Sequence, residues 1–130
     1  MLNASSNERR ELNYDVLPRA TFCDPEVASV GLTERQAQEQ GYRVKAGKFD
    51  YANLTRPIVS DETDGFIKIV AEEHSGRILG GHIVGADASS LIHEVAAAMA
   101  GELTVSDVGN TLHAYPTLSE GVRYACQGIM

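Results

Sequence analysis

The sequence predicts a single α+β domain, an antiparallel sheet flanked by helices. Strand patterns occupy the chain up to Val84 and the longer helical patterns follow, an order typical of α+β domains rather than of a doubly wound parallel sheet. A chain of 130 residues can bury one hydrophobic core, so we assign residues 17–130 to one domain. Residues 1–16 are polar and aperiodic, which indicates a flexible N-terminal arm or linker remnant, with order beginning at Pro18.

The first predicted elements are two short strands and a helix. Thr21 to Cys23 is an extended run, Asp24-Pro25 interrupts it, and Val27 to Val30 resumes it. A short helix follows, because Thr33 and Gln36 have the spacing of a capping box.

Three further strands are predicted from alternating apolar and polar residues. The first covers residues 42–49, and residues 51–56 can form one helical turn after it. Residues 58–64 have the composition of a polar loop. The clearest hairpin pairs residues 67–72 with residues 77–84.

The last part of the chain has helical patterns. Apolar residues recur with helical spacing from Ser89 to Glu102, and one flank of this helix carries only small residues: Ala97, Ala98 and Ala100. That flank permits another element to approach closely. Two shorter helices follow, each begun by a capping box: Thr104 with Asp107, and Thr117 with Glu120.

Charge and composition argue against two classes of partner. The net charge is -7, and the scattered lysines and arginines form no basic stripe, so we expect no nucleic-acid partner. The N-terminal residues lack the apolar core of a secretory signal, and the longest apolar run, Val95 to Ala100, is too short to span a bilayer. We therefore expect a cytoplasmic protein without a membrane partner.

The two cysteines have neither redox spacing nor metal-ligand spacing. Cys23 falls in an apolar strand pattern and is expected to be buried and inert, and Cys126 lies on the last predicted helix. Neither is a good candidate for a nucleophile.

Four segments, in this order and spacing, resemble one enzyme family. They are Arg19 to Gly31, Asp64 to Lys68, Ile78 to Gly85, and His113-Ala114-Tyr115-Pro116-Thr117-Leu118-Ser119-Glu120. Together they are similar to the C-terminal dimerisation (interface) domain of FAD-dependent pyridine-nucleotide disulfide oxidoreductases, which include dihydrolipoamide dehydrogenase and mercuric-reductase-like proteins. The resemblance implies a sheet of about five strands flanked by helices, with helices at the subunit interface.

The resemblance further implies a homodimerisation domain of an FAD- and NAD(P)H-dependent oxidoreductase. In the family, an FAD domain with a cysteine pair and a pyridine-nucleotide domain come first; in this chain, no G-x-G-x-x-G turn follows a predicted strand, and no cysteine pair occurs. We expect the chain alone to hold no cofactor and to be inactive. Its expected partners are a second copy, whose flavin and disulfide site it completes, and the missing domains of the same polypeptide.

Tyr115 stands where the family motif H-P-T-x-x-E has its catalytic histidine. A histidine can exchange a proton with a reacting thiol near neutral pH, whereas a tyrosine ordinarily titrates at about pH 10. We expect impaired dithiol exchange, which leaves a metal ion, a quinone or another small acceptor open. The backbone role survives: Pro116 can follow a cis peptide bond, and the Tyr115 carbonyl can meet the flavin of the partner subunit.

Glu120 and His113, the other two candidate catalytic residues, each have two interpretations. Glu120 either orients the catalytic residue, as the resemblance implies, or completes the capping box with Thr117. His113 is either an ordinary polar residue or a proton relay through Tyr115, since residues two apart in an extended chain share a face.

Two other functions stay open at this point. The chain could be a stand-alone dimerisation or binding module without catalysis. The second open function is metal binding by His113, Glu120 and Cys126. The histidines form no ligand cluster in sequence, so we expect no metal.

Overall fold

The computed structural model describes residues 11–130, so residues 1–10 of the predicted arm lie outside the described chain. The core of the fold is a five-stranded sheet in the order β1-β2-β5-β4-β3. Its strands are β1 (Arg19–Thr21), β2 (Val27–Gly31), β3 (Val44–Asp50), β4 (Phe66–Glu72) and β5 (Ile78–Val84). Every neighbouring pair is antiparallel, which confirms the predicted α+β class.

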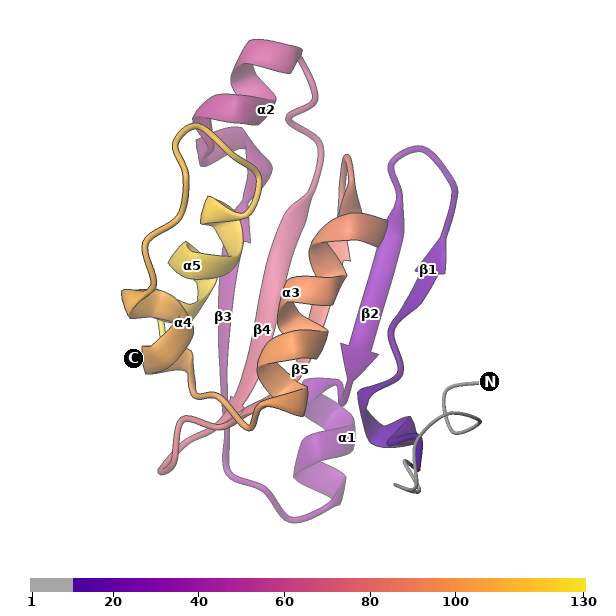
Figure 1. Cartoon of the computed structure of the whole chain (residues 1–130), viewed down its shortest axis with the longest axis vertical. Coiled ribbons are helices and arrows are strands. Elements are labelled where there is room, and N and C mark those ends of the chain that lie inside the picture. The colour runs from indigo at the N-terminus through magenta and orange to yellow at the C-terminus, as the bar shows by residue number, and fades with distance from the viewer. Residues whose placement is uncertain (1–10) are drawn as a thin grey trace, which may run out of the picture.

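Helices lie on both faces of the sheet (Figure 1). On one face are α3 (Ala88–Ala100) and α5 (Glu120–Gln127), with α4 (Val105–Asn110) packed against α5. On the other face, at the lower end of the sheet in this view, is α1 (Glu34–Glu39). The remaining helical segments are η1 (Tyr14–Val16), η2 (Tyr51–Asn53) and α2 (Thr55–Ser60), and α2 stands at the upper end.

The main core lies between the sheet and the helices α3 and α5. The strand β4 contributes Ile67 and Ile69 to it, and α3 contributes Ile92 and Val95; all four side chains are buried. Val70 alternates with these residues along β4 and therefore packs on the opposite face, in a smaller cluster beneath α1. The alternation of β4 thus places helices on both of its faces.

Gly80 and Gly81, in the middle of β5, leave room for neighbours on the two faces of the sheet. A Cβ on Gly80 would lie 2.1 Å from the carbonyl oxygen of Leu32, just before α1. A Cβ on Gly81 would lie 2.7 Å from a methyl carbon of Val95 on α3. Glycine is therefore required here by close packing, in spite of its weak preference for strands.

Two of the differences from the predicted element boundaries have a clear physical cause. The ladder between β1 and β2 ends at the pair Thr21 and Val27, so Cys23 lies in the exposed turn rather than in the strand. The predicted polar loop at residues 58–64 begins as helix, because α2 continues to Ser60. Pro57 does not prevent this, since it is the third helical residue and backbone N–H groups in the first turn have no partner within the helix.

Order also begins before Pro18, contrary to the prediction. In η1, the side chain of the capping residue Asn13 accepts a hydrogen bond from the backbone N–H of Asp15 at 3.0 Å. Val16 then packs against the main core. One partly buried apolar side chain and one cap therefore order a segment whose composition is otherwise that of a linker.

Candidate functional site

Residues 111–119 connect α4 to α5, and we call them the α4–α5 loop. The loop contains all the predicted site residues except Glu120, which is the first residue of α5. The loop leaves α4, rises past α5 to the level of α2, and turns back into α5 (Figure 1). Its start is held firmly, because Nε of Arg123 and Nε2 of Gln127 both donate to the carbonyl oxygen of Gly109, at 3.3 and 2.9 Å.

Tyr115 lies at the tip of the loop and is 72% exposed. Its phenol oxygen is 3.2 Å from Oγ1 of Thr55, the first residue of α2. The peptide bond between Tyr115 and Pro116 is cis, the form that the sequence allows. Among residues 11–130, no hydrogen bond uses the Tyr115 carbonyl oxygen, so this oxygen is free to meet a group from elsewhere.

His113 is buried beneath the loop, with 7% of its side chain exposed. Its Nε2 lies 2.5 Å from Oε1 of Glu94 on α3, and its Nδ1 lies 3.0 Å from the carbonyl oxygen of Thr111. His113 therefore contacts α3 while Tyr115 contacts α2. The loop is not a regular strand, so the side chains of His113 and Tyr115 do not share a face or a partner. Within the described residues, no hydrogen bond joins these two side chains, as a proton relay would require.

Glu120 is 5% exposed, and both of its oxygens have partners within the chain. Its Oε2 accepts from the backbone N–H of Thr117 at 2.9 Å, and its Oε1 accepts from the Tyr124 hydroxyl at 3.3 Å. Only half of the predicted capping box forms, because the Thr117 hydroxyl donates to the carbonyl oxygen of Ala114 at 2.7 Å. This geometry favours the capping interpretation of Glu120.

The tip of the α4–α5 loop therefore exposes mainly apolar groups, together with the Tyr115 hydroxyl. Leu112 is 87% exposed, and Tyr115 and Pro116 are exposed beside it. The ionisable side chains His113 and Glu120 lie underneath. The loop can present a carbonyl oxygen and a phenol to another molecule, and it presents no carboxylate or imidazole at its tip.

Sequence reasoning does not find Thr55 and Glu94, the two residues that hold the loop against α2 and α3. Thr55 contacts a residue 60 positions away and Glu94 a residue 19 positions away. Neither residue belongs to a motif or a capping pattern. Only the packing of the helices brings them to the loop.

The two cysteines differ in exposure, and for Cys23 the prediction is wrong. Cys23 is exposed because β1 ends before it, and its Sγ donates to the carbonyl oxygen of Pro25 at 3.2 Å. Cys126 is fully buried in the main core. Burial, with a smaller contribution from the charge of Glu94, raises the pKa of the Cys126 thiol to about 12.

We expect iodoacetamide to label Cys23 of the native chain and to label Cys126 more than about 100-fold more slowly, because only a solvent-accessible thiolate reacts. Mass spectrometry of tryptic peptides over time measures both rates. In urea the two rates should converge. Equal rates in the native chain would show that α5 does not hold Cys126 against the sheet in solution.

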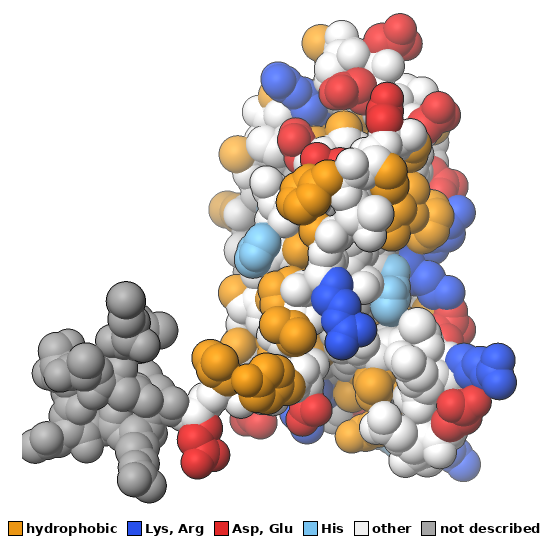
Figure 2. Space-filling view, turned by 90° about the vertical axis from the view of Figure 1, so that its right-hand side faces the viewer, with side chains coloured by type: hydrophobic (Ala, Val, Ile, Leu, Met, Phe, Trp, Pro, Cys, Tyr) orange, Lys and Arg blue, Asp and Glu red, His pale blue; other side chains and the backbone are white. Residues whose placement is uncertain are grey.

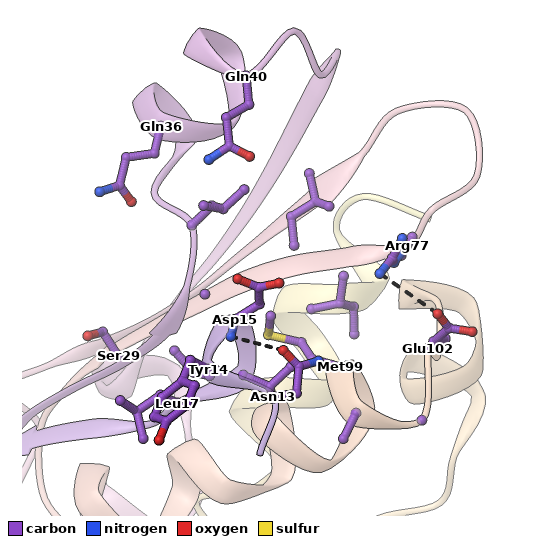
Figure 3. Close-up of a pocket in the computed structure, with 18 of the residues that line it drawn as sticks. Asn13, Tyr14, Asp15, Leu17, Ser29, Gln36, Gln40, Arg77, Met99 and Glu102 are labelled. Atoms are coloured by element: carbon purple, nitrogen blue, oxygen red, sulfur yellow. Dashed lines mark hydrogen bonds and ion pairs between the residues drawn. The ribbon is translucent and has the colours of Figure 1, made fainter. Parts of the chain in front are cut away.

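A cavity of about 580 Å³ opens at the other end of the sheet, between η1, α1 and the end of α3. Figure 3 shows Gln36 and Gln40 of α1 on one side of it and Arg77 and Glu102 on another. Nη2 of Arg77 and Oε1 of Glu102 are 3.9 Å apart. None of the predicted site residues lines this cavity.

A second cavity, of about 640 Å³, lies beside the turns at the α2 end and is acidic. Figure 2 shows acidic side chains gathered at that end. Six of them line the cavity: Asp24, Glu26, Asp61, Glu62, Asp64 and Asp87. Hydrogen bonds from Ser89, above all from its backbone N–H at 2.9 Å, lower the pKa of Glu26.

Within residues 11–130, no group of three or more His, Cys, Asp or Glu side chains is arranged to hold a metal ion. In particular, no such group joins His113, Glu120 and Cys126. None of the helices in the described part of the chain is both long and apolar enough to cross a membrane.

Comparison with known proteins decides the family. Residues 17–126 match the family described as pyridine nucleotide-disulphide oxidoreductase, dimerisation domain. The chain belongs to this family. This dimerisation domain is 44% identical over 119 residues to the dihydrolipoyl dehydrogenase of Corynebacterium glutamicum, and 42% identical over 117 residues to that of Bacillus subtilis. Each match covers 90% of this chain and 25% of the relative.

Solved structures agree with the family assignment. LpdA from Mycobacterium tuberculosis superposes with a TM-score of 0.87 at 26% identity, over 93% of this chain and 26% of LpdA. The HOCl-induced flavoprotein disulfide reductase RclA from Escherichia coli superposes with a TM-score of 0.83 at 25% identity, over 88% of this chain and 26% of RclA. The dimerisation domain described here thus spans about a quarter of the length of these relatives.

Proposed function

We propose that this dimerisation domain joins two copies of an FAD- and NAD(P)H-dependent oxidoreductase, and that its α4–α5 loop completes the flavin and disulfide site of the partner subunit. One observation carries the proposal: the Tyr115–Pro116 turn is exposed at the tip of a loop that buried side chains anchor. The names of the relatives, dihydrolipoyl dehydrogenase and flavoprotein disulfide reductase, support this class of reaction.

The residues of the loop fit a flavin held by the other subunit. FAD, when bound, supplies electron transfer between a nicotinamide and a disulfide. The Tyr115 carbonyl oxygen, which has no donor among residues 11–130, is free to approach the ring. The Tyr115 hydroxyl can form a hydrogen bond with a bound acceptor.

The proposed homodimer surface combines the loop with the outer side of α3. Four residues at helical spacing are exposed there: Ser90, His93, Ala97 and Ala100. Of the predicted alanine flank, Ala98 instead faces the core. The small exposed residues allow a second copy to approach α3 closely, and the contact between His113 and Glu94 makes the loop and α3 one continuous surface.

A second apolar surface lies on the β1 side of the sheet. Figure 2 shows hydrophobic side chains gathered there. Large exposed apolar residues in this part of the chain are Leu12, Tyr14, Leu17, Phe22 and Val27. We assign this surface to the FAD and NAD(P) domains of the same polypeptide, because exposed apolar side chains gathered in one place are typical of a contact with another domain. The mercuric-reductase-like branch and the cytoplasmic location stay predictions.

Sedimentation equilibrium of the chain tests the dimer. We expect a dimer, and we expect Ala97→Arg to weaken it at least about tenfold, because a long cation would be buried against the second copy. Gln38→Arg is the matched control, since Gln38 is exposed on α1, across the sheet from the proposed surface. A wild-type monomer, or equal effects of the two variants, would contradict the proposed surface.

A hybrid enzyme separates catalysis from the alternative function, a stand-alone dimerisation or binding module. In the hybrid, residues 17–126 replace the matching domain of the Bacillus subtilis dihydrolipoyl dehydrogenase. We expect a yellow dimer whose flavin is reduced by NADH, whereas the separate chain should purify colourless. The stand-alone module would be favoured if the hybrid forms a dimer but does not oxidise dihydrolipoamide, even when Tyr115→His restores the histidine of the family motif.

A further inference from the structure

We infer that His113 is a positioning residue: by binding Glu94 of α3 it holds the α4–α5 loop in the shape that turns Tyr115 and Pro116 outward. The role of the loop at a partner subunit rests on the proposed function. The contact that gives the loop its shape does not, because it lies within a single chain.

The loop needs such a contact because its backbone does not hold itself. Among residues 11–130, no hydrogen bond between two backbone groups involves residues 112–117. The bonds that fix this segment use side chains, namely those of Thr55, Glu94, His113, Tyr115, Thr117 and Glu120. Loss of one of these side chains should therefore alter the loop more than loss of a similar contact would alter a strand.

Of these contacts, the pair of His113 and Glu94 is the one best placed to hold the middle of the loop. Nε2 and Oε1 are in close contact, at 2.5 Å, and the imidazole is 7% exposed, so water competes little for this hydrogen bond. The bond between Tyr115 and Thr55 is longer, at 3.2 Å, and exposed. The contacts of Glu120 hold only the end of the loop, where α5 begins.

The same imidazole also fixes the local backbone. Nδ1 of His113 lies 3.0 Å from the carbonyl oxygen of Thr111, so the ring joins the start of the loop to α3. The imidazole thus bridges two oxygen atoms, one in the backbone of the loop and one in the side chain of α3.

Residue-resolved hydrogen exchange of the full chain tests this role. We expect Glu94→Ala and His113→Gln to speed exchange of the hydrogen-bonded loop amides, those of Thr111 and Thr117, by about tenfold or more, because a buried bond that holds the loop is lost. The amides of β4 and β5 should keep their wild-type rates. Glu94→Gln keeps an acceptor oxygen and the same volume, so it should fold, and it should give an intermediate rate.

His82→Gln is the matched control. His82 is also partly buried, and its Nε2 lies 3.0 Å from a backbone oxygen, that of Leu32, but it is on β5 and outside the loop. It should leave exchange of the Thr111 and Thr117 amides unchanged. The double variant Glu94→Ala with His113→Gln should exchange no faster than His113→Gln alone, since that variant already removes the contact with Glu94. Unchanged loop exchange in the single variants, or a uniform rise that includes β4 and β5, would overturn the inference.

The same variants separate this inference from the proposed function. If loop exchange rises while the dimer dissociation constant stays at its wild-type value, the positioning role stands and the loop is not part of the dimer contact. If the chain dimerises but loop exchange does not respond, the positioning role is wrong and the dimer proposal stands.

Discussion

Replacing Tyr115 by histidine in the hybrid enzyme is expected to raise kcat for dihydrolipoamide at least about 100-fold, the lower part of the range for a positioned general acid–base. Tyr115 already stands at the exposed tip of the loop, with Pro116 in the cis form behind it. An imidazole there would titrate near neutral pH and could exchange a proton with the reacting thiol. The tyrosine phenol cannot do so at a useful rate.

Steady-state kinetics against pH would check this result. In Tyr115→His, kcat should depend on one added group that titrates near neutral pH. Tyr115→Phe is the control, since it keeps the ring and removes only the hydroxyl that contacts Thr55. We expect Tyr115→Phe to stay within a few-fold of the unaltered hybrid. Equal activity of the three proteins would show that position 115 does not take part in dithiol exchange.

Truncation of Tyr51 to alanine is expected to destabilise the domain by about 3 to 5 kcal/mol, the usual cost of removing a large buried aromatic side chain. Tyr51 is completely buried, and its hydroxyl donates to the carbonyl oxygen of Ala86 at 2.8 Å. The ring also fills the space beside Gly85, where a Cβ would lie 2.5 Å from it. Burial, helped by the nearby carboxylate of Asp87, raises the pKa of Tyr51.

Urea unfolding of the chain measures the loss. Tyr51→Phe should cost only about 1 to 2 kcal/mol, because it removes the hydrogen bond and keeps the ring. Tyr42→Ala should cost less than Tyr51→Ala, since Tyr42 is partly exposed, at 38%, and loses less buried area. A small effect of Tyr51→Ala, similar to that of Tyr42→Ala, would contradict the burial of the ring.

Much of the fold is predictable because it depends on short patterns. The capping boxes of Thr33 with Gln36 and of Thr104 with Asp107 form as predicted, since both partners lie within one helical turn. The hairpin of β4 and β5 also forms, because alternating residues and a turn specify it locally. The helical capping at Thr117 fails in part, because the Ala114 carbonyl competes for the Thr117 hydroxyl.

The errors arise where a nearby contact overrides composition. The segment before Pro18 has the polarity of a linker, but the side chain of Val16 packs against the core. Cys23 has apolar neighbours in sequence, but the ladder of β1 and β2 stops before it. Hydrophobicity alone does not tell where an edge strand ends, because that depends on the residues of the partner strand.

The sequence by itself determined the α+β class, the family resemblance and the unusual tyrosine at position 115, since all three are properties of local order and spacing. The tertiary structure alone decided how that tyrosine is presented. It placed His113 beneath the loop against Glu94, and Tyr115 outside it against Thr55. These contacts join residues far apart in the chain, and they exist only because α2 and α3 pack on either side of a loop whose backbone forms few bonds of its own.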